Sequence, residues 1–184
     1  VMTCAKTIAI NSRRKLSYFL LWISCLAIAV APVGAQQTAT VHHDLDVRLT
    51  PDSAGLEVKD RITLPKAVDG FSFLLHQDLQ PEALTPGARM RGGRGYSGAV
   101  PVREWEVRFD RPSDQITLEY RGRIHHPLET HSQNYAGGRS STPGSISEKG
   151  VFLSASSYWF PVVPDRLLSF SMRTRLPDGW SAIS

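Results

Sequence analysis

Residues 150–161 have the sequence GVFLSASSYWFP, and residues 176–184 have the sequence LPDGWSAIS. These two segments hold a large share of the aromatic surface of the chain, and aromatic side chains contribute heavily to the energy of a protein core. We therefore expect this part of the chain to be the packing centre. Between the two segments, apolar and polar side chains alternate, which predicts a half-buried strand. The apolar positions are Leu168, Phe170, Met172 and Leu176.

The same alternation recurs nearer the amino terminus. Residues 41–49 place Val, His43, Leu and Val on one face and polar residues on the other. A segment with turn composition follows at 51–55, and alternation resumes over 56–64. Two alternating segments joined by a short turn predict a β-hairpin.

Further alternating segments follow, and helical periodicity is absent. They are residues 71–75, 105–109 and 116–120, with a turn composition at 111–114. No window has apolar residues at helical spacing for more than one turn. Short strands with turn chemistry between them predict an all-β domain, an antiparallel β-sandwich or twisted sheets of short strands. Residues 125–149 break the pattern and are predicted to be a long polar loop.

The first 35 residues have the features of an export signal. Residues 13–15 are basic, residues 16–30 are an apolar run that predicts a leader helix, and residues 33–35 are small. These features predict a signal peptide that is cleaved before Gln36. The mature domain would then span residues 36–184 and be periplasmic or secreted. If the leader is not cleaved, it would anchor the protein to a membrane through residues 16–30.

Removal of the leader changes the charge balance. The chain of 184 residues has a formal net charge of +4. Four of its 21 basic residues lie in the leader, so the mature chain keeps 17 basic residues against 17 acidic ones. Such a neutral domain gives no electrostatic reason to bind nucleic acid. Both cysteines, Cys4 and Cys25, also lie in the leader, so the exported domain has no thiol for a disulfide or a thiolate site.

The order of the segments resembles the end of the amino-terminal β domain of the zinc-dependent aminopeptidases of peptidase family M1. The resemblance is found at residues 150–153, at 158–161 and in the strand that ends at 176–182. It extends toward the amino terminus, where residues 46–51 and 56–62 look like the opening hairpin of that domain. It is a pattern of segments without a single diagnostic motif.

The resemblance implies a non-catalytic fragment of an exported metallo-aminopeptidase, truncated at its carboxyl end. Such a domain would pack on a catalytic zinc domain and form one wall of the cleft that holds the peptide substrate. In the family, the zinc ligands and the general base lie in that next domain, so we expect zinc there and no cofactor in this chain. The sequence contains no H-E-x-x-H. We therefore assign no catalytic, cofactor-binding or metal-binding residue and expect the chain alone to be inactive.

One family feature is missing from the segment where it is expected. The amino-terminal domain of the family contributes a Gln or Glu to the substrate amino group shortly before the Trp-Phe-Pro region. This chain has Ser154, Ser156 and Ser157 there, and no acid or amide lies between Glu148 and Trp159. The resemblance therefore implies either a different mode of substrate binding or a loss of activity.

Two other motifs favour ordinary structural roles. Residues 93–98 satisfy the spacing G-x-G-x-x-G, but Pro101 follows where a dinucleotide-binding loop would begin a helix. Residues 89–96 resemble an RGG segment, which binds single-stranded nucleic acid in other proteins. An exported protein seldom meets that partner, so we expect a solvated inter-strand loop.

The histidines leave a metal site open. His42 and His43 are neighbours on a predicted strand and would point to opposite faces. His125, His126 and His131 lie in the predicted loop and would be able to converge on one ion. Zinc requires three or four such ligands. Whether this loop binds anything is left open by the sequence.

A free-standing periplasmic β-sandwich that binds a ligand or a partner protein is the alternative function. In that case Tyr158, Trp159 and Phe160 would form an exposed recognition patch. A self-contained hydrolase is disfavoured because the chain has no G-x-S-x-G motif and the mature part has no cysteine.

Overall fold

The computed structural model describes residues 39–131 and 139–183, and the side chains of residues 129–141 lie outside this description. The predicted signal peptide and leader helix also lie outside the described residues. Among the described residues, no helix has the length and hydropathy needed to cross a membrane.

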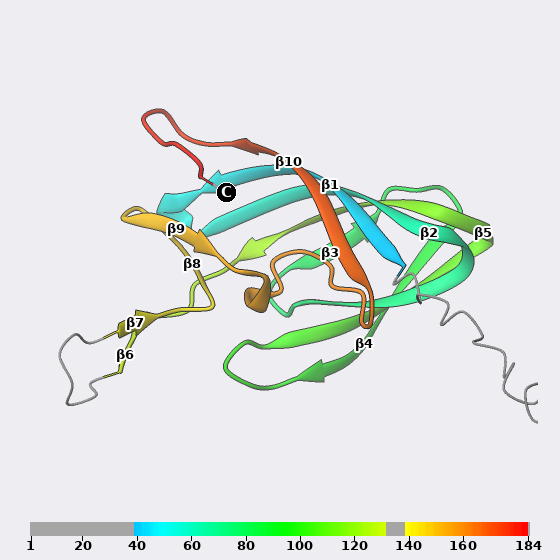
Figure 1. Ribbon diagram of the computed structural model, residues 1–184, viewed down its shortest axis with the longest axis horizontal. Helices are drawn as coiled ribbons and strands as arrows, with labels where there is room; N and C mark the ends of the chain where they lie inside the picture. Colours follow the sequence, from blue (N-terminus) through cyan, green and yellow to red (C-terminus); the bar gives the residue numbers. More distant parts are fainter. Residues whose placement is uncertain (1–38, 132–138, 184) are drawn as a thin grey trace, which may run out of the picture. The chain divides into compact units, whose positions relative to one another are not determined.

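The described chain is predominantly β, as the sequence predicts. A six-stranded sheet has the order β10-β1-β2-β5-β3, and β4 also pairs with β5 (Figure 1). Its strands are β1 (Thr40–Thr50), β2 (Gly55–His76), β3 (Gln80–Ala83), β4 (Ala88–Tyr96), β5 (Val102–Arg123) and β10 (Leu167–Arg175). Two small hairpins complete the strands, β6 (Glu129–His131) with β7 (Arg139–Ser141) and β8 (Gly144–Ser147) with β9 (Gly150–Leu153). The 3₁₀ turns are η1 (Pro51–Ser53) and η2 (Ala155–Ser157).

The predicted opening hairpin is confirmed. β1 and β2 pair antiparallel, and η1 joins them with Pro51 in its first turn. Ala54 closes the turn in the left-handed conformation, with φ of 56°. The alternation in β1 gives one buried face, which consists of Val41, His43, Leu45, Val47 and Leu49. A strand with period-two alternation buries one face in this way.

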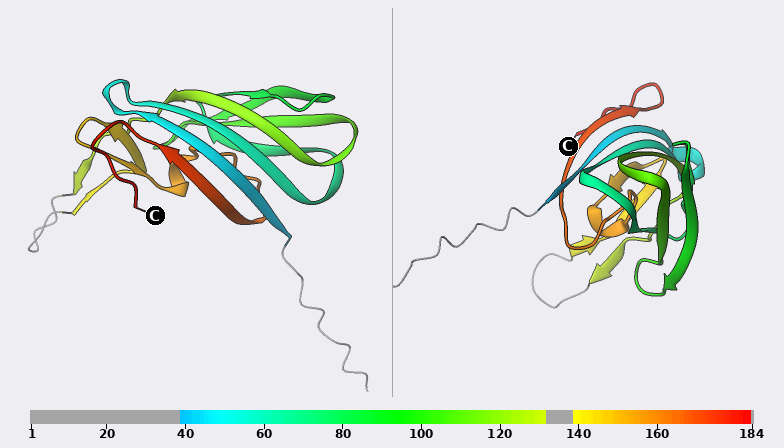
Figure 2. Two further views of the ribbon diagram at one scale, coloured as in Figure 1. Left: turned by 90° about the horizontal axis from the view of Figure 1, so that it is seen from above. Right: turned by 90° about the vertical axis from the view of Figure 1, so that its right-hand side faces the viewer.

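The prediction of short strands is wrong for β2 and β5. Each is 22 residues long, and each contains a segment that the sequence predicts as a break. The predicted turn at 111–114 lies inside β5, and Pro65 lies inside β2. Register shifts between Thr63 and Gly70 absorb the irregular residues, because a bulge tolerates a residue that cannot donate a ladder hydrogen bond. Figure 2 shows the two strands bending together.

The antiparallel prediction is wrong at one edge of the sheet, where β10 pairs parallel with β1. The register begins with Thr40 opposite Leu167 and ends with Arg48 opposite Arg175. Parallel neighbours need a crossover rather than a tight turn. Here the chain crosses after β9, through residues 154–166, and the result is a mixed sheet.

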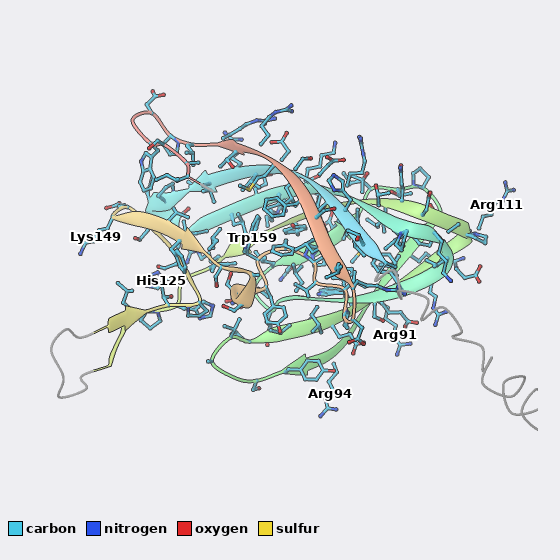
Figure 3. All side chains as sticks on the ribbon, viewed as in Figure 1. Arg91, Arg94, Arg111, His125, Lys149 and Trp159 are labelled. Carbon is cyan, nitrogen blue, oxygen red and sulfur yellow. The ribbon has the colours of Figure 1, made fainter. Side chains whose placement is uncertain are left out.

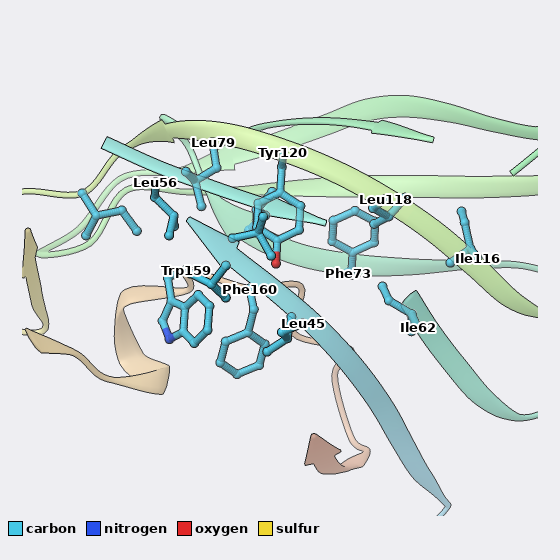
Figure 4. Close-up of a cluster of buried hydrophobic side chains, with 14 of the residues drawn as sticks. Leu45, Leu56, Ile62, Phe73, Leu79, Ile116, Leu118, Tyr120, Trp159 and Phe160 are labelled. Carbon is cyan, nitrogen blue, oxygen red and sulfur yellow. The ribbon is translucent and has the colours of Figure 1, made fainter. Parts of the chain in front are cut away.

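The core lies between the inner face of this sheet and the crossover segment. Trp159 and Phe160 pack against residues of β1, β2 and β5, among them Leu45 and Tyr120 (Figure 4). Backbone hydrogen bonds hold the segment to the edge of β2, with Leu74 and Val162 exchanging two bonds of 2.9 Å. The expected packing centre is therefore only partly confirmed, because Phe152 is exposed and most of the core comes from the three long strands.

Candidate functional site

The inner side of β10 is apolar and largely uncovered. Leu168, Phe170 and Met172 are 42%, 55% and 40% exposed. Their register partners on β1 are buried. The crossover segment covers β1, whereas no described element packs over β10. The predicted strand is present, but the prediction that it is half-buried is wrong.

A groove continues this uncovered surface toward the carboxyl end. It has a volume of about 420 Å³ and lies between β1, β9, β10 and residues 176–183. Its walls are mostly apolar and include Leu49, Leu153, Met172, Leu176 and Trp180. We call Leu168, Phe170, Met172 and this groove the open apolar face.

The opposite side of β10 is polar and is bonded to β1. Ser169 Oγ lies 2.9 Å from His42 Nδ1, and the Arg175 guanidinium lies 2.8 Å from an Asp46 carboxylate oxygen. Ser171 donates a hydrogen bond to Asp44, which lowers the pKa of that carboxyl group. β10 is thus an amphipathic edge strand whose apolar side has no described partner.

The glycine- and arginine-rich segment is a strand, and the prediction of a loop is wrong. Residues 88–96 form β4 and pair with β5, with a register shift between Gly92 and Gly95. No helix follows the glycines, so the dinucleotide hypothesis has no structural support. Arg91 and Arg94 are exposed on the outside of this hairpin (Figure 3), and the Arg94 guanidinium lies 5.4 Å from the centre of the Tyr96 ring.

The structure does not test whether His125, His126 and His131 converge on one ion. His125 bonds to Ser145, and the side chain of His131 lies outside the description. His126 instead meets His76, with the two Nε2 atoms 3.1 Å apart. His76 Nδ1 accepts the amide proton of Asp78 at 3.2 Å, so its Nε2 carries the proton and donates to His126. The sequence could not reveal this pair, whose members are 50 residues apart.

The described residues do not fit a zinc ion. Among them, no group of three or more His, Cys, Asp or Glu side chains is placed to hold a metal. The buried ring of His76 has a lowered pKa because burial disfavours its charged form.

The serines near the Trp-Phe-Pro region are engaged within their own segment. Ser157 is buried and donates to the Ser154 carbonyl at 2.8 Å. The Ser154 hydroxyl donates to the Pro143 carbonyl and lies 2.7 Å from that of Ser156.

One ionisable pair is buried in the core. His43 on β1 and Asp60 on β2 are 1% and 0% exposed, and Nδ1 of the ring lies 2.8 Å from a carboxylate oxygen. Burial raises the pKa of Asp60. The sequence holds a signal for this pair, because each residue occupies an inward position in the alternation of its strand.

Solved structures are the only comparison in which matches to this chain are found. No protein-family model matches it, and no curated protein matches it. It is similar to an M1 zinc metallopeptidase from Deinococcus radiodurans, solved as a mutant bound to a Tyr-Ser-Ala substrate, with 20% identity and a TM-score of 0.38 over 76% of this chain and 33% of that chain. The same enzyme without the mutation gives 20% identity and a TM-score of 0.36 over 76% and 32%.

A mutant of a two-domain M1 zinc metallopeptidase bound to L-tryptophan is also similar, with 19% identity and a TM-score of 0.33 over 76% of this chain and 33% of that chain. These neighbours are M1 zinc metallopeptidases. The chain spans about a third of the length of the solved proteins that it matches.

Proposed function

We propose that the described residues form the amino-terminal β domain of an exported M1-like metallo-aminopeptidase. In this proposal the domain catalyses no reaction itself. It packs on a catalytic zinc domain and forms one wall of the cleft that binds the peptide substrate. The zinc and the groups that react with the peptide belong to that second domain.

The observation that carries the proposal is the open apolar face. Neighbouring apolar side chains that are exposed together mark an interaction surface more often than a solvated one. Covering the exposed parts of Leu168, Phe170 and Met172 would contribute about 1 kcal/mol for each side chain. The face lies on the strand and the carboxyl-terminal segment whose order resembles the M1 domain, so a following domain is the occupant that fits it.

The hydrogen bonding of the crossover segment favours a structural role, as part of a wall of the cleft, over a catalytic role. The hydroxyl groups of Ser154 and Ser157 are bonded to backbone carbonyls of the segment and its surroundings. They are therefore engaged in holding the turn that precedes Trp159. A peptide amino group would need another partner.

The free-standing binding module is less well supported. Its proposed recognition patch consists of Tyr158, Trp159 and Phe160, and the structure buries Trp159 and Phe160 in the core. The same burial agrees with a domain whose aromatic cluster serves its own packing.

The decisive experiment is to sequence the coding region beyond codon 184. We expect an open frame that encodes H-E-x-x-H within a second domain. A stop codon directly after Ser184 would contradict the proposal. The 184-residue chain by itself should neither hydrolyse aminoacyl anilides nor retain stoichiometric zinc after dialysis, and turnover by this chain would also contradict it.

A pair of variants tests the docking surface. Both are made in the longer protein that we expect the reading frame beyond codon 184 to encode. Phe170→Asp should weaken docking, because it would bury a charge at the interface. The β domain should then be more susceptible to limited proteolysis, and the rate of anilide hydrolysis should fall. Leu84→Asp, a change at a similarly exposed leucine outside the open apolar face, should leave both unchanged. Equal effects of the two changes would show that Phe170 does not face the second domain.

Export has its own test. A mature amino terminus at Gln36, found by mass spectrometry of the secreted or periplasmic protein, is expected. An intact leader in that protein would instead favour anchoring through residues 16–30.

A further inference from the structure

A second, smaller pocket opens beside the buried His43–Asp60 pair. It has a volume of about 170 Å³ and lies between the start of β1, the crossover segment and the start of β10. Its walls are mostly apolar and include Val41, Phe160, Val162 and Leu168, and His43 is one of its lining residues.

The imidazole of His43 is held in one orientation. Its Nδ1 faces Asp60 at 2.8 Å, and the Phe160 ring meets it edge to face with centroids 5.7 Å apart. Among the described residues, no side chain or backbone group forms a hydrogen bond with Nε2. Asp60 engages Nδ1, so Nε2 is the ring nitrogen that remains for a molecule in the pocket.

The size of the pocket limits what it can hold. An apolar protein cavity of about 150 Å³ accommodates one benzene molecule. The pocket of about 170 Å³ therefore has room for a short branched chain or a single ring. Arg166 also lines it, is otherwise exposed and supplies a positive charge.

We propose that this pocket binds a small apolar carboxylic acid, with its hydrocarbon group against the apolar walls and its carboxylate on Nε2 of His43. The positive charge of Arg166 favours an anion over a neutral amide of the same shape. The proposal uses only groups that lie in the described residues. Because Leu168 also belongs to the open apolar face, a docked second domain would cover this wall of the pocket, and binding is therefore tested on the 184-residue chain.

A carboxylate in the pocket needs a hydrogen on Nε2. A ring that carries hydrogen on both nitrogens donates from Nδ1 to the Asp60 carboxylate and from Nε2 to the ligand.

Other ionisable groups also lie around the pair. Tyr120 on β5 faces Asp60 and has a pKa raised well above its usual value by burial, so it stays neutral. The remaining groups, from β1 and from the lining of the pocket, are His42, Asp44, Tyr158 and Arg166.

The test uses the 184-residue chain with isovalerate as the probe and isovaleramide as its neutral match. Calorimetry measures the affinity for each compound. We expect isovalerate to bind with a Kd of about 1 mM. The nitrogen NMR shift of His43 Nε2 should change on binding, and isovaleramide should bind at least about tenfold more weakly.

Variants connect the binding to the pocket. Leu168→Trp fills the pocket and should abolish binding, whereas Leu84→Trp, at a leucine outside the pocket, should not alter it. Arg166→Gln should weaken binding severalfold, and Arg173→Gln is its control on β10. His43→Gln should weaken binding severalfold, and if this buried change prevents folding, the Leu168 pair decides. No binding at about 10 mM, equal affinity for the amide, or an unchanged affinity in Leu168→Trp would each overturn the proposal.

Discussion

Replacing Phe160 and Phe170 by alanine, one at a time, separates the closed part of the inner face from its open part. Phe160 is 7% exposed and contacts the rings of His43 and Trp159. Truncating a phenylalanine at such a position costs about 3–5 kcal/mol, because the transfer free energy is lost and a cavity remains. Phe170 is 55% exposed. Its truncation should cost about 1 kcal/mol, since less than half of its surface leaves water and solvent fills the space.

The assay is urea unfolding of the 184-residue chain followed by tryptophan fluorescence. With a slope of about 2 kcal/mol per molar urea, Phe160→Ala should lower the midpoint by about 2 M and Phe170→Ala by about 0.5 M, both with unchanged slopes. Equal shifts of the midpoint would refute the reasoning. They would mean that Phe170 is as well covered as Phe160, and the open apolar face would then not exist.

Three further changes test the interior. Tyr120→Phe removes a buried hydroxyl that has no hydrogen-bond partner among the described residues. In urea unfolding, the free energy of unfolding should stay the same or rise by about 1 kcal/mol. A clear fall in this free energy would mean that the hydroxyl is hydrogen-bonded. Burial raises the pKa of Asp60 above 3.8, so its contribution to stability is full below that value and is lost as the pH rises through the raised pKa. Over this pH range the native chain should therefore lose stability relative to Asp60→Asn. Parallel curves of unfolding free energy against pH for the two proteins would contradict this prediction. Gly122→Ala would place a Cβ atom 2.0 Å from the Asp78 carbonyl oxygen and should cost about 1–3 kcal/mol. Gly95→Ala meets nothing within 4 Å and should leave the melting temperature almost unchanged.

Local alternation was sufficient to predict the elements of the opening hairpin. The inward positions of β1, His43 included, follow from period two alone. The lengths of β2 and β5 could not be predicted in this way. Turn residues at 111–114 and Pro65 favour breaks locally, but each strand has a partner along almost its whole length, and pairing overrides the local preference.

Whether a side chain at the candidate site is buried depends on which element packs on that face of its strand. Alternation in the sequence does not show this. Met172 and Leu45 each lie between two polar residues in the sequence, yet Met172 is exposed and Leu45 is buried. The difference is that Phe160 packs over β1 and no described residue packs over β10. The His76–His126 contact was hidden for a related reason, because it depends on where the chain returns after β5.

The parallel pairing of β1 with β10 also bears on how the chain reaches its native state. His42 and Ser169, which are register partners, are 127 residues apart in sequence. Closing so long a loop is slow, and nucleation must come from the more local hairpin of β1 and β2. The outer edge of β1 therefore stays unpaired until β10 (Leu167–Arg175) has emerged, and during that interval it can template pairing with another nascent chain.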